Sequence, residues 1–173
     1  LPSVSCFKAK GFDVLLVGRV LSDSSIIDRP YAIKRFQLFF KKGFLFYASY
    51  NIRLFVFLLF QKADVLHAND LDTLFANWLV SKIRKKVIIY DSHEYFTGVP
   101  EIQQRPLVKK TWEKIEKLIF PNLKYVFTVN QSIANIYKNK YNVEVKVLRN
   151  LPFKNKIEKI QTKESLNLPL NKN

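Results

Sequence analysis

Short apolar runs alternate with helical patterns along most of this 173-residue chain, and this alternation limits the fold more than any other feature. A run of four or five apolar residues between helices is typical of a strand buried on both faces. The alternation therefore predicts an α/β domain with a Rossmann-like open parallel sheet and helices on both faces. The runs lie at residues 14–17, 65–68, 87–90, 125–129 and 145–148.

Apolar spacing at a period of 3.6 residues predicts the intervening helices. Asn130 is an N-cap residue type for a helix that follows it. Gly11 is expected to end a short N-terminal helix that no strand precedes, so we expect a further element upstream. Residues 37–40 predict an additional strand. The two clearest helical faces are Leu71, Leu74, Phe75, Trp78 and Leu79, and then Val108, Trp112, Ile115 and Ile119.

The segment 44–60 is apolar nearly all round, although Asn51 and Arg53 interrupt it. It is too short and too polar for a typical membrane span. We therefore expect a helix buried between the sheet and a neighbouring element, with an interfacial helix as the alternative.

The chain carries 29 Lys and Arg against 14 Asp and Glu, a formal charge of +15. Such a charge attracts phosphates, nucleic acid or an anionic membrane. The basic residues are spread over the whole chain and no helix combines them with base-reading residues, which argues against nucleic acid. The single cysteine, Cys6, cannot form an intramolecular disulfide, and we expect a cytoplasmic protein.

Both histidines, His67 and His93, fall at the predicted carboxyl ends of strands, where open parallel sheets bind ligands. Ser92, His93 and Glu94 cannot form a hydrolase triad, because consecutive side chains point in different directions. The sequence has no G-x-S-x-G elbow, P-loop or G-x-G-x-x-G motif, and no recognised spacing of metal ligands.

Acidic residues near these strand ends are candidates for binding a substrate. Asp70 and Asp72 could contact an acceptor hydroxyl, although structural roles are favoured for them, as the N-cap and a first-turn acid of the following helix. Glu94 and Glu101 flank a long connection, residues 95–106, of a length that is usually functional.

Five short sequence segments, taken in their order and spacing, resemble the N-terminal domain of family 4 glycosyltransferases of the GT-B type, particularly bacterial ones in surface polysaccharide synthesis. The resemblance spans about residues 11–152, and the segments are ADVLHANDLDTL, VIIYDSHEYF, TWEKIEKLIFPNL, YVFTVNQSIANIY and VLRNLP. It implies the N-terminal half of a GT-B fold and retaining transfer of a sugar from a nucleotide-sugar donor to an acceptor hydroxyl.

The resemblance also implies site residues. His93 matches the catalytic histidine beside the transferred sugar, and Asn150 matches the point where the chain crosses to the donor domain. Asp70, Ser92, Glu94 and Glu101 are then candidates for binding the acceptor or substrate. No cofactor and no metal are expected, and the partners are the nucleotide-sugar donor and a sugar or lipid-linked acceptor.

The resemblance predicts an acceptor-side domain over residues 1–152, with its first strand missing, and a linker over 153–173 toward an absent donor-binding domain. This chain alone is expected to be inactive. The positive charge predicts peripheral contact with the anionic inner face of the cell membrane. A non-catalytic α/β domain that binds phosphorylated ligands is the alternative.

Overall fold

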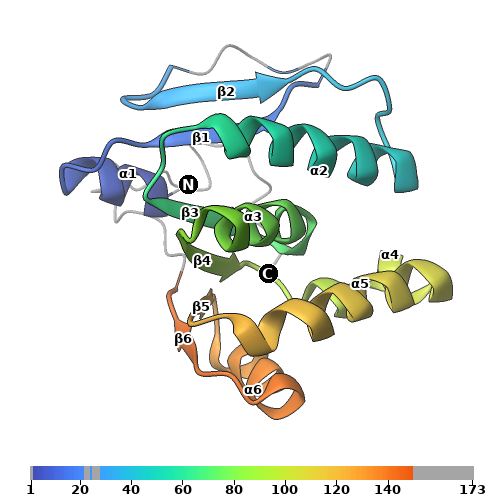
Figure 1. The fold of residues 1–173 in the computed structure, drawn as a ribbon. Coiled ribbons are helices and arrows are strands. Elements are labelled where there is room, and N and C mark those ends of the chain that lie inside the picture. The colour runs from blue at the N-terminus through green and yellow to red at the C-terminus, as the bar shows by residue number, and fades with distance from the viewer. Residues whose placement is uncertain (1, 22–23, 25–27, 150–173) are drawn as a thin grey trace, which may run out of the picture.

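The computed structural model describes residues 2–21, 24 and 28–149 and has an α/β fold (Figure 1). All strand pairings among these residues are parallel. The strands are β1 (Leu15–Arg19), β2 (Ala32–Phe36), β3 (Val65–Asn69), β4 (Val87–Ser92), β5 (Tyr125–Thr128) and β6 (Val145–Val147). The α-helices are α1 (Pro2–Ala9), α2 (Gly43–Phe60), α3 (Leu71–Arg84), α4 (Pro100–Gln103), α5 (Pro106–Ile119) and α6 (Gln131–Tyr141), and two short 3₁₀ helices are η1 (Phe96–Gly98) and η2 (Phe120–Asn122).

The strands form two hydrogen-bonded groups. β1 pairs with β2, and the other four strands form a sheet in the order β3-β4-β5-β6. In Figure 1, β1 lies between β2 and β3, but the two groups share no hydrogen-bonded pair among the described residues. The larger sheet positions the loops that matter below, because the carboxyl ends of its parallel strands meet at one edge.

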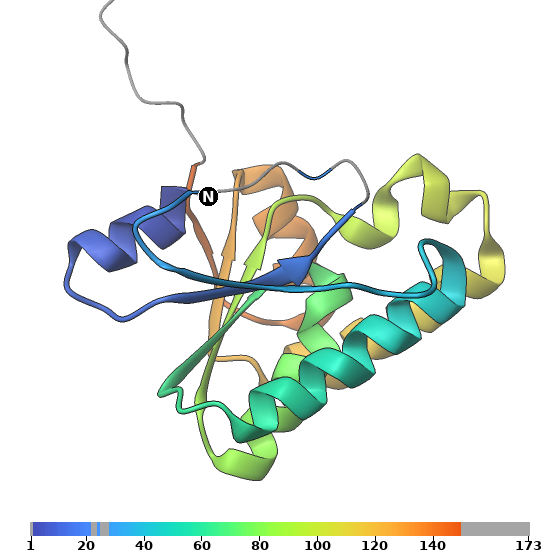
Figure 2. The same cartoon turned by 90° about the horizontal axis from the view of Figure 1, so that it is seen from above.

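Helices cover both faces of the strands, as the sequence predicts. In Figure 2, α1 lies on one side of the strands, while α2, α3, α5 and α6 lie on the other. The predicted helix ends are also confirmed. Gly11 follows α1 with a φ of 86°, and the Asn130 side chain accepts a hydrogen bond from the Ile133 N–H at 2.9 Å.

Two clusters of buried side chains make up the core. The larger lies under α3, α5 and α6 and is rich in aromatic rings, including Tyr90, Trp112, Phe120 and Tyr137. The smaller joins α2 to β2, β3 and α3, as with Leu54 in α2. Aromatic rings supply much of the larger core, since each buries a large apolar area.

The prediction of a strand at residues 37–40 is wrong. The strand is β2, which ends at Phe36, and Phe39 is 92% exposed in the connection that follows. Among the described residues, β2 pairs with β1 alone, and its side chains are covered only in part, since Ala32 and Lys34 are exposed. Its pattern therefore mixes Ile33 and Phe36 with the consecutive cations Lys34 and Arg35, and a search for apolar runs misses it.

The prediction that segment 44–60 is a buried helix is half wrong. It forms α2, but only Phe46, Tyr50, Leu54 and Leu58 are buried. By length and composition alone this helix is also long and apolar enough to cross a membrane, so the expectation that it is too short and too polar for a span is wrong on those two criteria. Its outer side is exposed.

The connection at residues 95–106 is compact, since it folds into η1 and α4. Phe96, Thr97 and Ile102 are buried within it. Gly98 is required by close approach, because a Cβ at this position would lie 2.2 Å from Cδ1 of Tyr95.

Candidate active site at the carboxyl ends of the strands

A cluster of polar side chains lies where β3 and β4 end. The register of these strands places Asn69 opposite Asp91, and the Asp70 N–H donates to the Asp91 carbonyl at 2.9 Å. This pairing brings the two following loops together at the carboxyl edge of the sheet. Ligands of open parallel sheets bind at this edge.

Asp91 is the central residue of the cluster. Its Oδ2 lies 3.4 Å from Nε2 of His93 and 3.7 Å from Nε2 of His67. The second distance is too long for a hydrogen bond, and Nε2 of His67 is buried with no hydrogen-bond partner among the described residues. Burial by itself raises the pKa of Asp91, but the two imidazoles outweigh it and hold that pKa below its usual value. Asp91 is therefore an anion that faces His93 from one side.

Asp70 holds His93 from the other side. Its Oδ1 accepts the His93 backbone N–H at 2.8 Å, and its Oδ2 lies 3.7 Å from Nδ1 of the ring. Asp70 has a φ of 58°, a left-handed conformation that is rare outside glycine and that concentrates at functional sites. Burial raises the pKa of Asp70, and the His93 N–H opposes that shift.

The N-cap role favoured for Asp70 is wrong. It occupies the position before α3, but its side chain makes no capping hydrogen bond to that helix. The reason is that both of its oxygens face His93.

Further carboxylates surround the two aspartates. Burial and then the charge of Asp70 raise the pKa of Asp72 to about 6, while Arg19 at the end of β1 works against this shift. Burial, followed by the charges of Asp70 and Glu101, raises the pKa of Glu94. Carboxylate oxygens accept hydrogen bonds from hydroxyl groups, so this surface suits a hydroxyl-rich ligand.

Ser92 is fully buried and has no surface exposed to a ligand. Its hydroxyl donates to the Glu94 carbonyl at 2.7 Å and lies 3.1 Å from the Tyr137 hydroxyl, while Thr128 donates to the Ser92 carbonyl. Ser92 thus shapes the loop that carries His93 and does not reach the surface at which a substrate would bind.

Of the predicted site residues, the structure brings His93, Asp70 and Glu94 together. Glu101 lies on α4, is exposed, and acts on Glu94 through its charge. Asn150 lies outside the described residues. The contact of Asp91 with both histidines and the burial of Asp72 were not predicted from the sequence. Asp91 lies near the carboxyl end of β4, the signal that drew attention to His93, whereas Asp72 lies in the first turn of α3.

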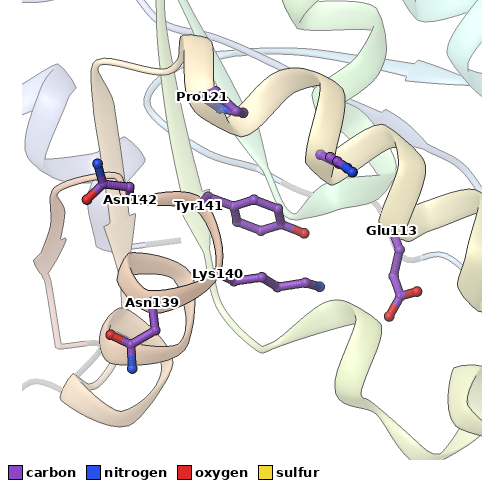
Figure 3. A pocket seen from close by; sticks show the side chains of 7 residues that line it. Glu113, Pro121, Asn139, Lys140, Tyr141 and Asn142 are labelled. Carbon is purple, nitrogen blue, oxygen red and sulfur yellow. The ribbon is translucent and has the colours of Figure 1, made fainter.

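In the described part of the chain, no group of three or more His, Cys, Asp or Glu side chains could hold a metal ion. A hollow of about 670 Å³ lies between α5 and α6 (Figure 3). None of its lining residues belongs to the cluster at the strand ends. They are Glu113, Lys117, Pro121, Asn139, Lys140, Tyr141 and Asn142.

The fold and the cluster together define a Rossmann-like α/β domain with a polar site at the carboxyl edge of its sheet. Residues 4–150 match the family described as Glycosyltransferase Family 4, which covers most of the chain. The chain therefore belongs to glycosyltransferase family 4. No curated protein matches it.

Proposed function

We propose that this chain is the N-terminal, acceptor-binding domain of a GT-B type glycosyltransferase that moves a sugar from a nucleotide-sugar to an acceptor hydroxyl with retention at the anomeric carbon. Membership of glycosyltransferase family 4 supports a transferase. The observation that carries the site is His93, which is held between Asp70 and Asp91 at the carboxyl edge of the sheet.

His93 is the catalytic residue of this proposal. Its imidazole binds a hydroxyl of the donor sugar and stabilises the positive character that develops at the anomeric carbon, by placement and not by covalent attack. Asp91 and Asp70 are positioning residues, since they fix the ring and the backbone of His93. Such preorganisation matters because the groups need no reordering when the reaction takes place.

In this proposal the acceptor is bound by three carboxylates, those of Glu94, Glu101 and Asp70. Their carboxylates accept hydrogen bonds from acceptor hydroxyls, and the pKa of Glu94 is raised by burial first and then by the charges of Asp70 and Glu101. This lining also disfavours the alternative of a domain that binds phosphorylated ligands at this edge, because carboxylates repel phosphate.

The rest of the proposal concerns the complete protein. A second domain, reached near Asn150, binds the nucleotide-sugar, and neither a metal nor a cofactor takes part. The acceptor is a sugar or a lipid-linked sugar of cell-surface polysaccharide or glycolipid synthesis, and the enzyme works at the cytoplasmic face of the membrane.

The test uses the full-length protein with a panel of nucleotide-sugars and with sugar or lipid-linked acceptors. Release of the nucleotide shows whether transfer occurs, and NMR of the product gives its anomeric configuration. We expect release that depends on the acceptor, and a product with the donor's configuration. An inverted product contradicts the mechanism, and binding of phosphorylated sugars without any transfer supports the alternative.

A further inference from the structure

The outer side of α2 is an exposed apolar surface that the proposed catalytic site does not use. Leu45, Ile52, Val56 and Phe60 are all exposed, and Phe60 is 78% exposed. Their spacing of seven, four and four residues places them on one side of the helix, opposite the buried row that begins at Phe46. Because α2 has 18 residues, this apolar stripe runs along most of a helix about 27 Å long.

α2 is long enough to cross a bilayer, but polar contacts hold it against the domain. Asn51 donates to the Asp72 carbonyl at 2.8 Å and accepts the Ala76 N–H at 3.3 Å. Arg84 donates to the Leu58 carbonyl at 3.2 Å. A helix tied to α3 at both its middle and its end can lie along a membrane surface without leaving the fold.

The segment that carries the stripe is basic. Residues 29–63 contain seven Lys and Arg and no Asp or Glu. Four of these cations, Lys34, Arg35, Lys41 and Arg53, line a hollow of about 950 Å³ between β2 and α2. Ile52 and Val56 line the same hollow, so the basic and apolar surfaces are continuous.

We propose that the α2 surface, meaning the stripe Leu45, Ile52, Val56 and Phe60 together with this basic hollow, docks the protein on an anionic lipid bilayer. The helix lies in the plane of the interface with its stripe among the upper acyl chains. Lipid phosphates enter the hollow. An apolar face flanked by cations is the pattern of interfacial helices that bind anionic lipid.

Charge also decides between a membrane and a second copy of the chain. A symmetric dimer through this face would bring the same cations against themselves, and like charges across an interface oppose association. An anionic bilayer offers both an apolar layer and negative charge. The inference adds a named surface to the membrane location in the proposed function, but it does not involve the site at the strand ends, so loss of transfer and loss of lipid binding can be told apart.

The experiment measures sedimentation of the full-length protein with vesicles. We expect binding to vesicles of equal parts phosphatidylcholine and phosphatidylglycerol, weakened at high salt, and little binding to phosphatidylcholine alone. The apolar test variant is Ile52→Ser with Val56→Ser, and the charge test variant is Lys41→Glu with Lys42→Glu. Each is expected to lower binding at least about tenfold, since each removes one of the two attractions.

The controls change exposed residues on another helix. Leu107→Ser removes an exposed apolar side chain from α5, and Lys110→Glu with Lys114→Glu makes the same change in net charge. We expect both controls to bind as the unchanged protein does. Equal losses in controls and test variants, or no binding to the anionic vesicles, overturn the proposal, as does a dimer in analytical ultracentrifugation that only the test variants abolish.

A fluorescent reporter checks depth without weakening binding. Phe60→Trp places an indole at the exposed end of the stripe, and quenching by brominated lipids then gives its depth. We expect quenching near the boundary between headgroups and acyl chains. Quenching that is strongest at the centre of the bilayer indicates a spanning helix and overturns the interfacial arrangement.

Discussion

The ring of His93 lies between the carboxylates of Asp70 and Asp91. Near them, burial and the charge of Asp70 make the ionised form of Asp72 unfavourable. Asp72 is largely buried next to Asp70, and its pKa is raised to about 6. A raised pKa in the folded state means that the folded protein holds this proton more tightly than the unfolded chain. The ionised form therefore destabilises the fold at neutral pH.

This linkage predicts the effect of Asp72→Asn. In the unchanged protein, the contribution of Asp72 to stability is fully present below pH 4 and is lost as the pH rises to about 6. Asp72→Asn should remove this slope and raise the free energy of unfolding at pH 7 by up to about 3 kcal/mol. Urea unfolding at pH 4 and pH 7 measures this change in unfolding free energy. An unchanged slope with pH in the variant would show that Asp72 does not cause the pH dependence.

A second residue prediction concerns Glu116, which is fully buried in α5. Its carboxylate accepts hydrogen bonds from Tyr141 Oη at 2.7 Å, Lys140 Nζ at 3.1 Å and Thr97 Oγ1 at 3.3 Å. Glu116→Gln replaces one acceptor with a donor, and we expect a loss of about 2 kcal/mol in unfolding free energy. Glu113→Gln on the same helix is the control, with an expected change within about 0.5 kcal/mol. Equal losses would contradict the role of the network.

For single residues, the sequence predicts where a side chain lies in the fold better than it predicts which side chains it contacts. His93 could be found because it ends an apolar run and resembles a family position. The contact of Asp91 with both imidazoles could not be predicted from the sequence, because it depends on the register of β3 and β4 and on the turn at Asp70. The burial of Glu116 could have been noticed, since it lies on the same helical face as Trp112 and Ile119.

Among the elements, those with a buried face were the easiest to predict from sequence. β3, β4 and β5 carry apolar runs because helices and neighbouring strands cover them. β2 escaped prediction because exposed positions such as Lys34 alternate with covered ones, so it carries no apolar run. For α2 the sequence predicted too much burial. A helix that is apolar all round is normally buried, but here only one side of α2 is buried and the other side faces outward.

The compact connection between β4 and α5 allows a prediction at the scale of elements. Gly98→Ala would place a Cβ against the Tyr95 ring, and we expect it to lower the unfolding free energy by about 1–3 kcal/mol. Gly18→Ala is the matched control, because no described atom beyond its two chain neighbours lies within 4 Å of its Cβ position. Thermal unfolding of both variants measures the difference, and equal midpoints would mean that the connection adapts to the added methyl group.

The whole molecule separates two kinds of surface. Acids gather at the carboxyl ends of β3 and β4, whereas the segment from β2 through α2 carries only basic charge. The alternation of strands and helices was sufficient to predict the α/β fold that family membership supports. It could not predict that the strands form two separate hydrogen-bonded groups, because pairing depends on contacts between distant segments.

The turnover of His93→Ala in the full-length enzyme tests most directly whether His93 acts in sugar transfer. Glu113→Ala, a change far from the strand ends, is the control. We predict that His93→Ala lowers kcat by about 100-fold or more while its thermal midpoint stays close to that of the unchanged enzyme. Normal turnover in this variant would remove His93 from the mechanism and contradict the account.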